Sequence, residues 1–328
     1  MLENFIAAQK MISAAQNIVL STHEEPDADG IGSMLALEHA LRKINKNPLS
    51  FSPASLPKIL NFLPGQKEIK KSLPYKKKEI DLVIGLDYGS AERLEIKKQY
   101  PTLDCPFLTV DHHCQGNHLG LKIIDVNSSS TSEIIYRFLT FLKIPIDNNI
   151  ATCLLSGIID DTGAFQHTNT TAETLKIAGQ LMLNGARWKK ISEAKKQLST
   201  KEKALALSQT FENIEIDSEN SFASSFISYR SLSESKSGFK ETKIVGFLNS
   251  ISETKIAILS IEKTPGIIDV SLRSQKKYDI NVAKIAQHFG GGGHKLAAGF
   301  RTDSSYEQIL KKIKSFLEKN KKTLSLVD

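Results

Sequence analysis

Short apolar runs alternate with helix-like segments along the first half of the chain. The runs are rich in β-branched and aromatic side chains, which is typical of strands that are buried on both faces of a sheet. They predict strands at residues 17–22, 80–87 and 106–111. Amphipathic patterns predict helices at 30–44, 131–144, 148–160 and 172–186. Since strands that alternate with helices usually form a parallel sheet, we expect an α/β fold whose mostly parallel sheet carries helices on both faces.

The character of the sequence changes after residue 186. A charged, helix-favouring stretch at 187–213 predicts a helical linker. Beyond it, the patterns predict strands at 222–228, 254–262 and 266–274 and helices at 281–289 and 305–320. A chain of 328 residues is too long for one typical hydrophobic core. We therefore predict a first domain at 1–186, the linker, and a smaller α+β domain at 214–328.

The composition is that of an ordinary soluble globular protein, with 40% apolar and 24% charged residues. The N-terminal segment is amphipathic and carries Glu3 where a signal peptide would be positive, and no apolar run is long enough to cross a membrane. Cys105, Cys114 and Cys153 lack C-x-x-C spacing, which indicates reduced thiols rather than disulfides or a zinc site. We therefore expect a cytoplasmic protein without a membrane partner.

The formal net charge is +7, and most of the positive charge is lysine. A basic balance favours anionic partners, but charge alone does not establish a nucleic-acid partner. The lysine-rich stretches at 76–78 and 319–322 are more typical of solvated faces than of binding patches.

Acidic and histidine residues gather in four clusters that are far apart in the sequence. Three of them follow predicted strands, and ligands of open α/β sheets bind outside the carboxyl ends of the strands. Side chains that are distant in sequence can therefore converge on one cavity. The candidate residues are His23, Asp27 and Asp29; Asp87; Asp111, His112 and His113; and Asp161, which follows Asp160.

Together these clusters contain the oxygen and imidazole ligands for a pair of divalent cations. Asp27 and Asp29 follow one strand end, His23 adds an imidazole, and Asp87 is the best candidate for a carboxylate that bridges the ions. A pair of cations about 3.5–4 Å apart polarises a phosphoryl oxygen and lowers the pKa of a water molecule. The mixture of carboxylates and imidazoles suits Mn²⁺ best, with Mg²⁺ as the alternative. Phosphoester hydrolysis is therefore the leading hypothesis.

Each cluster taken alone also has a purely structural interpretation. Asp27 and Asp29 can form a turn that caps the next helix, and Asp87 can be an ordinary acid at a strand end. The triplet at 111–113 is harder to explain in this way, because three titratable residues directly after an apolar strand are costly unless they bind something. The four clusters together favour a binding site. We expect His39, His118 and His288 to be ordinary packing or surface residues.

A run of four glycines, Gly290–Gly293, precedes His294 in the second half of the chain. The run can be a flexible linker, or it can bring backbone N–H groups close to an anion. In the second case His294 contacts a phosphate or a leaving group. Arg273 lies in the predicted strand at 266–274 and offers a planar fork for a phosphate.

With these motifs identified, the chain resembles the DHH phosphoesterase superfamily over nearly its whole length. HEEPDADGIGS at 23–33 is similar to the first motif of that family, Asp87 to the second, the triplet at 111–113 to the third and IDDTGAF at 159–165 to the fourth. NVAKIAQHFGGGGHKLAAGF at 281–300 resembles the DHH-associated substrate-binding domain. The length is similar to that of the bacterial nanoRNase and pAp-phosphatase subfamily.

The resemblance implies an Mn²⁺-dependent enzyme that hydrolyses very short oligoribonucleotides to mononucleotides and removes the 3′-phosphate of adenosine 3′,5′-bisphosphate (pAp). It also implies a cleft between the domains and a homodimer. One ion would be held by His23, Asp27 and Asp87, and the other by Asp29, Asp87, His112 and Asp161. Asp111, His112 and His113 would be the catalytic triplet, with His113 supporting the metal shell or the scissile phosphate. The substrate would be bound by Arg273, Gly292, Gly293 and His294.

Two positions depart from the family pattern. Glu25 stands where an Asn commonly precedes the Pro-Asp of the first motif, and an added acid near the metals would change their affinity or the tolerance for substrate phosphates. Asp160 adjoins Asp161, and we assign the ligand to Asp161, the residue before Thr-Gly.

Other functions compete with the short-RNA and bisphosphate hydrolase. The same site could act on linear dinucleotides such as pApA or pGpG from cyclic-dinucleotide signalling, which the sequence does not distinguish from other short strands. An exonuclease for longer strands is disfavoured, because the sequence carries no added oligonucleotide-binding barrel. A non-enzymatic nucleotide-binding module would require a broken ligand set, and none of the expected ligand positions is missing.

Overall fold

The computed structural model describes residues 1–73, 79–113, 116–196, 208, 210–234 and 241–320. The chain divides into two compact units, Met1–Leu198 and Ser199–Asp328, each of which is described by itself. Part of the predicted linker, the lysines at 76–78, part of the stretch at 319–322 and Cys114 lie outside the described residues. Within the described ranges, no helix is both long enough and apolar enough to span a membrane.

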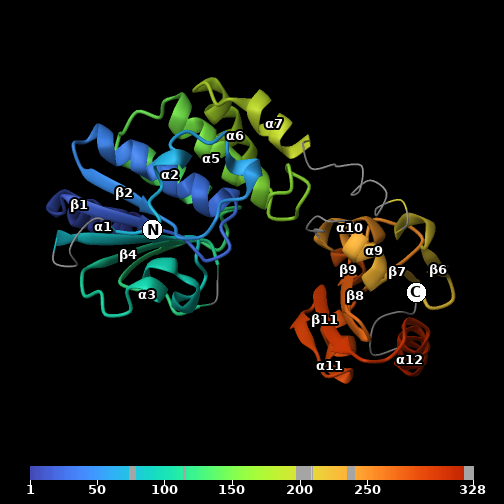
Figure 1. Ribbon diagram of the computed structural model, residues 1–328. Helices are drawn as coiled ribbons and strands as arrows, with labels where there is room; N and C mark the ends of the chain where they lie inside the picture. The colour runs from blue at the N-terminus through green and yellow to red at the C-terminus, as the bar shows by residue number, and fades with distance from the viewer. Residues whose placement is uncertain (74–78, 114–115, 197–207, 209, 235–240, 321–328) are drawn as a thin grey trace. The chain divides into compact units, whose positions relative to one another are not determined.

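The first unit is built on a sheet of five parallel strands in the order β2-β1-β3-β4-β5 (Figure 1). The strands are β1 (Asn17–Ser21), β2 (Asn47–Phe51), β3 (Leu82–Leu86), β4 (Phe107–Asp111) and β5 (Leu121–Ile124). The apolar runs predict β1, β3 and β4, which are almost completely buried. β2 and β5 lie at the edges, and their sequences, NPLSF and LKII, are too polar or too short to stand out. The predicted α/β fold with a parallel sheet is confirmed.

Polar side chains begin the principal helices of this unit. Asp27 caps α2, Ser130 caps α4, Asp147 caps α5 and Thr171 caps α6, each by accepting a backbone N–H group of the first helical turn. The helices are α1 (Leu2–Ala14), α2 (Ala28–Lys43), α3 (Glu95–Gln99), α4 (Thr131–Phe141), α5 (Asn148–Asp161), α6 (Ala172–Leu183) and α7 (Trp188–Lys196). The four helices predicted between residues 30 and 186 therefore correspond to α2, α4, α5 and α6.

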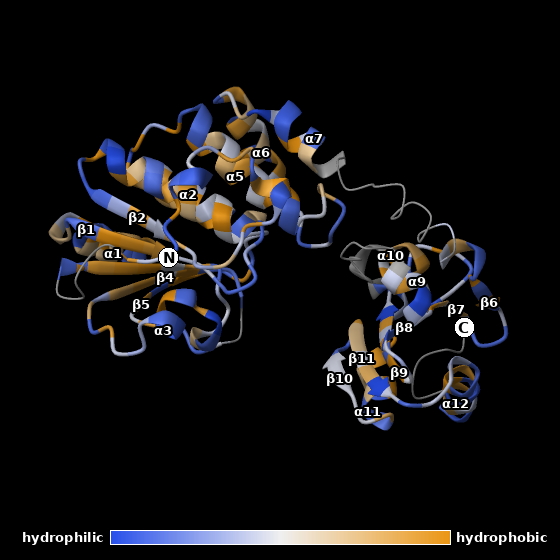
Figure 2. Ribbon diagram, in the orientation of Figure 1, coloured by the Kyte–Doolittle hydropathy of each residue, from blue (hydrophilic) through white to orange (hydrophobic). Residues whose placement is uncertain are grey.

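Apolar side chains cover both faces of the parallel sheet. On one face, α1, α2, α4 and α5 pack against strand residues such as Ile84 and Val110. On the other face, a smaller cluster around α3 includes Leu94 and Ile96. Figure 2 shows the consequence, because the central strands are apolar while the helices carry polar residues as well. The two-sided covering agrees with the apolar runs that predict these strands.

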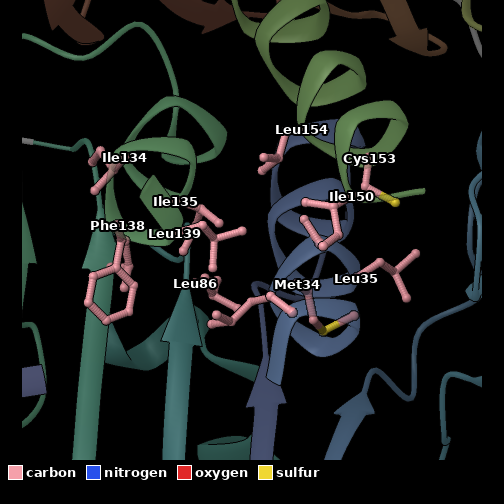
Figure 3. Close-up of a cluster of buried hydrophobic side chains, with 14 of the residues drawn as sticks. Met34, Leu35, Leu86, Ile134, Ile135, Phe138, Leu139, Ile150, Cys153 and Leu154 are labelled. Carbon is pink, nitrogen blue, oxygen red and sulfur yellow. The ribbon is translucent and has the colours of Figure 1, made fainter. Parts of the chain in front are cut away.

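Helix α2 is buried along most of its length. Met34 and Leu35 of α2, Leu86 of β3 and Leu154 of α5 belong to one cluster of buried side chains (Figure 3). The helices α2 and α5 approach each other closely at Gly32, where a Cβ would lie 2.5 Å from the carbonyl oxygen of Cys153. A side chain at position 32 would therefore push the two helices apart.

The second unit contains a six-stranded sheet in the order β10-β11-β9-β8-β7-β6. Neighbouring strands are antiparallel except β7 and β8, which are parallel. One face packs against α11 and α12, and the other against α10. The strands are β6 (Glu215–Asp217), β7 (Phe222–Ile227), β8 (Ile256–Thr264), β9 (Ile267–Ser274), β10 (Gly292–His294) and β11 (Ala297–Thr302). The helices are α9 (Tyr229–Glu234), α10 (Glu241–Leu248), α11 (Val282–His288) and α12 (Tyr306–Lys319).

We expect Gly32→Ala to lower the free energy of unfolding of the first unit by about 1–3 kcal/mol, the usual cost of overpacking a tight interior contact. Gly179→Ala is the matched control, because Gly179 lies in the middle of α6 with no atom within 4 Å of a Cβ placed there. Alanine at position 179 should raise the free energy of unfolding, by at most about 1 kcal/mol.

Urea unfolding measures both effects through the fluorescence of Trp188, the single tryptophan of the chain, which lies in the first unit. If the two alanine variants were equally stable, the contact between α2 and α5 would be looser than the backbone positions indicate.

Candidate metal and phosphate site

The first acidic cluster lies in the turn between β1 and α2. Oδ1 of Asp27 accepts the N–H groups of Asp29 (3.1 Å) and Gly30 (3.0 Å), and so caps α2. The same oxygen lies 3.6 Å from Nε2 of His23. Burial alone would raise the pKa of Asp27, but hydrogen bonds from His23 and from the backbone outweigh it and lower the pKa. Asp27 is therefore both a helix cap and an ionised group that faces an imidazole.

Asp29 is completely buried at the start of α2. Its carboxylate oxygens accept the N–H groups of Thr131 (2.7 Å) and Ser132 (2.9 Å), the first residues of α4. These N–H groups have no partner within the helix, so a carboxylate is a favourable acceptor for them. Gly157 of α5 leaves the necessary space, because a Cβ there would lie 2.4 Å from Oδ1 of Asp29. The Asp29 side chain thus bonds α2 to the start of α4 and lies close against α5.

Asp87 directly follows β3. Its φ of 53° lies in the left-handed region, which is uncommon for a residue other than glycine and turns the chain sharply after the strand. Oδ1 accepts the hydroxyl group of Thr131 at 3.1 Å. Oδ2 lies 3.9 Å from Nε2 of His23, and Oδ1 lies 3.6 Å from Nε2 of His112. Asp87 therefore lies between two imidazoles, as a bridging ligand would.

His112 and Asp161 meet from the ends of β4 and α5. The closest atoms, Nε2 of His112 and Oδ2 of Asp161, are 3.1 Å apart. Of the two adjacent acids at the end of α5, Asp161 faces this imidazole, whereas Asp160 accepts the N–H group of Ala28 at 3.3 Å. Glu25, the other departure from the family pattern, is exposed.

These side chains line one cavity of about 240 Å³ within the first unit. Its walls are formed by His23, Asp27, Asp87, Arg93, His112, His113, Asp161 and Asn169. Widely separated parts of the sequence therefore meet near the carboxyl ends of parallel strands, where ligands of such sheets usually bind.

Asp111 closes β4 behind this cavity and does not line it. Its carboxylate accepts the N–H groups of Tyr88 (3.0 Å) and Gly89 (2.8 Å) through Oδ2, while Oδ1 lies 2.7 Å from Nδ1 of His113. The imidazole of His118, which we expected to be an ordinary packing residue, lies against the ring of Tyr88 and 3.4 Å from Oδ2 of Asp111. Asp111 is thus surrounded by hydrogen-bond donors.

The donors around Asp111 keep it ionised although it is completely buried. Burial raises its pKa, but hydrogen bonds from His113 and from backbone N–H groups outweigh burial and lower the pKa to about 2. Asp111 therefore acts on its surroundings as a fixed negative charge. It orients His113 and holds the turn that follows β3.

Carboxylates in the cavity wall and the buried Asp29 beside it are too close to one another to ionise freely. Burial, and next the charge of Asp161, raises the pKa of Asp29 to about 8. Burial and the neighbouring carboxylates, first Asp29 and then Asp27, raise the pKa of Asp87 well above its usual value. Such shifts arise when like charges share a poorly solvated place. A divalent cation would relieve this repulsion.

The pKa of His112 is raised, which favours its positively charged form beside these carboxylates. Burial lowers it, but the hydrogen bond to Asp161 and the charges of Asp29 and Asp161 raise it to about 9. The protonated imidazole therefore neutralises part of the acidic cavity. A metal ion would take the place of that proton, since an imidazole that binds a metal must be neutral.

Among the described residues, three sets of side chains could each hold a metal ion, and they share members. The sets are Asp87, His112 and His113; His23, Asp27 and Asp87; and Asp29, His112 and Asp161, with the ligand atoms of each set within 4.8 Å of one another. Carboxylate oxygens and imidazole nitrogens fit a divalent cation of the Mg²⁺ or Mn²⁺ type. Asp87 and His112 each belong to two of these sets.

The expected substrate-binding residues lie in the second unit, on the edge strand β10 and on β9, two strands further into the sheet. His294 of β10 is directly opposite Ala297 of β11, which is directly opposite Arg273 of β9. Side chains in directly opposite positions point to the same face, so His294 and Arg273 lie on one face, two strand spacings (about 10 Å) apart. Gly292 and Gly293 belong to β10 as well. The glycine run therefore forms part of an edge strand, and the linker interpretation is wrong for these residues.

Arg273 is half-buried and has no ion pair with a carboxylate among the described residues. Nη1 donates to the carbonyl oxygen of Leu272 at 2.9 Å, and burial lowers the pKa of the guanidinium. A partly desolvated guanidinium with unused donors is a suitable partner for a phosphate.

Two residues of the cavity wall, Arg93 and Asn169, were not predicted from the sequence. Arg93 belongs to a 3-10 turn (Ala91–Arg93), and Asn169 follows α5 in a loop. Nδ2 of Asn169 donates to the carbonyl oxygens of Ser129 (2.9 Å) and Asp161 (3.3 Å), which leaves its Oδ1 without a partner. Neither residue carries a spacing signal, although an arginine close after Asp87 is a reasonable clue.

Two protein-family models match this chain. The N-terminal domain of the DHH family matches residues 17–158, and the DHHA1 domain matches residues 230–319. The first range contains the candidate metal ligands up to His112, and the second contains Arg273 and His294.

Two curated relatives are similar over most of the chain, and both are named bifunctional oligoribonuclease and PAP phosphatase NrnA. The protein of Bacillus subtilis is 30% identical over 297 residues, which are 88% of this chain and 90% of the relative. The protein of Thermus thermophilus is 25% identical over 318 residues, or 95% and 94% of the two chains. The crystal structure of an exopolyphosphatase-related protein from Bacteroides fragilis has the same fold, with a TM-score of 0.83, 24% identity and coverage of 99% and 98%.

We expect Asp87→Asn to stabilise the metal-free protein and to remove its stabilisation by Mn²⁺. The pKa of Asp87 is higher in the folded state than in the unfolded state, so ionisation of Asp87 destabilises the fold. This destabilisation is absent below the unfolded pKa of about 4 and grows as the pH rises above that value. Asparagine keeps the shape and tolerates the left-handed backbone. The midpoint of thermal unfolding in EDTA should therefore rise relative to the wild type, and the gain should be larger at pH 8 than at pH 5.

In the wild type, Mn²⁺ at one hundred times its Kd should add about 2.7 kcal/mol of stability, and Asp87→Asn should lose most of it. Asp104→Asn is the control, because Asp104 is an exposed acid outside the cavity. An Asp87→Asn protein that Mn²⁺ stabilised as much as the wild type would exclude Asp87 as a ligand.

Proposed function

Because this chain belongs to the DHH phosphoesterase family and is a hydrolase of that family, we propose that it hydrolyses very short oligoribonucleotides to mononucleotides and removes the 3′-phosphate of pAp. The observation that carries the proposal is the set of shared metal-ligand residues around one cavity of about 240 Å³. The two curated relatives named above support the choice of substrates, since both carry the two activities in their names.

We propose that His23, Asp27 and Asp87 hold one divalent cation, and that Asp29, Asp87, His112 and Asp161 hold a second. Two such ions polarise phosphoryl oxygens and lower the pKa of a water molecule when they are bound. Asp87 joins the two sets because its oxygens face both His23 and His112. Mn²⁺ suits the two imidazoles better than Mg²⁺ does.

His113 is the residue that we propose for proton transfer or for contact with the scissile phosphate. Its Nδ1 is held by Asp111 at 2.7 Å, and its ring lines the cavity. The buried, ionised Asp111 favours a proton on Nδ1 and stabilises the imidazolium that carries a second proton on Nε2. The Nε2–H group of that imidazolium would donate to a phosphate oxygen or pass its proton to a leaving-group oxygen. Asp111 is thus the positioning member of the triplet, and His113 the member that faces substrate.

The second unit is the part that we propose to select short substrates. Arg273 and His294 lie on one face of its sheet and offer a guanidinium fork and an imidazole to a phosphate. Backbone N–H groups of Gly292 and Gly293 can approach the same anion, because no side chain shields them. We also propose that a linker at 187–213 joins the two domains, that the protein forms a homodimer, and that it is cytoplasmic.

A ladder of RNA strands from two to twenty-four nucleotides tests the proposed substrate. We expect hydrolysis with Mn²⁺ to be fastest for the shortest strands and to fall with length, and we expect 3′-phosphate release from pAp. Comparison of kcat/KM for pApA, pGpG and pAp then ranks a linear dinucleotide against the bisphosphate as the preferred substrate.

His112→Ala is the negative control for the ladder, because loss of a catalytic metal ligand should lower kcat by at least about two orders of magnitude. Equal or faster cleavage of the longest strands would identify a longer-strand exonuclease instead. Turnover that His112→Ala left unchanged would remove the proposed mechanism.

We expect His294→Ala to raise KM for short RNA by about tenfold while the bound metal stays constant, since His294 lies in the second unit and not in the metal cavity. Lys295→Ala is the matched control, because it removes a neighbouring exposed charge that pairs with Asp279. Steady-state kinetics and metal analysis of the purified variants measure both quantities. A loss of metal in the His294→Ala protein would place that imidazole among the metal ligands.

A further inference from the structure

Arg93 is fixed at the cavity by its own backbone. Its carbonyl oxygen accepts the N–H group of Glu24 (3.1 Å), and its N–H group donates to the carbonyl oxygen of Ser90 (2.9 Å). The next residue, Leu94, forms an isolated antiparallel bridge with His23. The segment that carries Arg93 is therefore attached to the segment that carries a candidate metal ligand, and the guanidinium is directed to the same cavity.

The guanidinium of Arg93 has no carboxylate partner among the described residues. Two other arginines of the first unit have one, since Arg42 pairs with Glu38 and Glu68, and Arg137 pairs with Asp125 and Glu133. Arg187 instead donates to the amide oxygen of Asn149 at 2.8 Å, away from this cavity. In the described part of the chain, the guanidinium of Arg93 has one side-chain hydrogen-bond contact, from Nη2 to Nδ1 of His23 at 3.5 Å. An arginine that stays without an acid in a cavity lined by carboxylates is available to another anion.

The contact with His23 depends on which imidazole nitrogen carries the proton. Nε2 of His23 faces Asp27 and Asp87, so it is the nitrogen that would bind a cation. An imidazole that binds metal through Nε2 carries its proton on Nδ1. Nδ1 is then a donor, and it cannot accept a hydrogen bond from Arg93. A cation at His23 would therefore release the guanidinium.

The charges of the cavity lead to the same conclusion. The four carboxylates of the two proposed ligand sets, Asp27, Asp29, Asp87 and Asp161, balance two divalent cations. The charge of a bound phosphate is then left for another group. Arg93 is the guanidinium of this cavity wall, and its planar fork can hold two phosphate oxygens at once.

We propose that Arg93 is a substrate-binding residue that holds non-bridging phosphate oxygens once a cation occupies Nε2 of His23. For its natural ligand the inference rests on the proposed function, because the phosphate would be that of a short RNA or of pAp. The binding of phosphate itself does not require that function.

The test is isothermal titration calorimetry of inorganic phosphate into the full-length protein saturated with Mg²⁺. Arg93→Ala should weaken phosphate binding by about tenfold to hundredfold, as expected for a lost hydrogen bond to a charged group. Arg93→Lys should restore part of the affinity, because it keeps the charge but not the fork. Both variants should bind Mg²⁺ within about twofold of the wild type, and KM for pAp should rise more than kcat falls.

Lys98→Ala is the matched control, because Lys98 lies on the same segment but pairs with Glu24 and does not line the cavity. It removes the same charge from this side of the unit and should leave phosphate binding unchanged. The thermal unfolding midpoint of each variant establishes that it is folded. If the Arg93→Ala protein is unfolded, Arg93→Lys takes its place in the comparison.

Phosphate affinity within about twofold of the wild type in folded Arg93 variants would overturn the inference, and so would a loss of Mg²⁺ binding, which would make Arg93 a support of His23. These outcomes differ from failure of the proposed function. A wild-type protein that binds phosphate through Arg93 but cleaves neither short RNA nor pAp would refute the substrate assignment alone.

Discussion

The site depends on one constraint, the burial of the Asp29 carboxylate where three helices meet. Two N–H groups at the start of α4 bind its oxygens, and Gly157 of α5 leaves the room that the oxygens occupy. The helix N-terminus favours the charged form, while burial and Asp161 favour the neutral form. The carboxylate is thus held in a place where its negative charge is destabilising. The packing of α2 against α5 and the sheet offsets this electrostatic cost. A rigid, repelling set of acids is what a divalent cation needs.

Asp111, behind the cavity, and Asp87, in its wall, have opposite electrostatic surroundings. Asp111 is surrounded by donors and stays ionised, whereas Asp87 has other carboxylates around it and ionises with difficulty. The first is suited to orienting an imidazole, and the second to binding a cation that removes the repulsion. Burial alone does not distinguish the two roles, because both residues are buried. The difference lies in the hydrogen bonds that Asp111 receives from His113 and from backbone N–H groups, and in the like charges that surround Asp87.

The sequence predicted the parts of the fold and the site that follow strong local patterns. The strands β1, β3 and β4 were found because burial on both faces leaves continuous apolar runs, while the edge strands β2 and β5 leave none. The clusters at His23, Asp87 and His112 were found because each follows such a run. Arg93 and Asn169 were missed because an isolated polar residue in a loop belongs to no motif or periodic pattern. Only the three-dimensional path of the chain brings them to the cavity. The pairing of β10 with β11 was missed for the same reason, since a glycine run does not reveal its partner strand.

All residues of the cavity wall lie between positions 23 and 169, within the first of two separately compact units. The residues that line the reaction cavity can therefore stay constant while the second unit changes its sequence. Substitutions in the second unit can therefore be selected without altering the residues of the cavity wall. If Arg273 and His294 bind substrate as proposed, substitutions around them could change the substrate while the candidate metal ligands of the first unit stay the same.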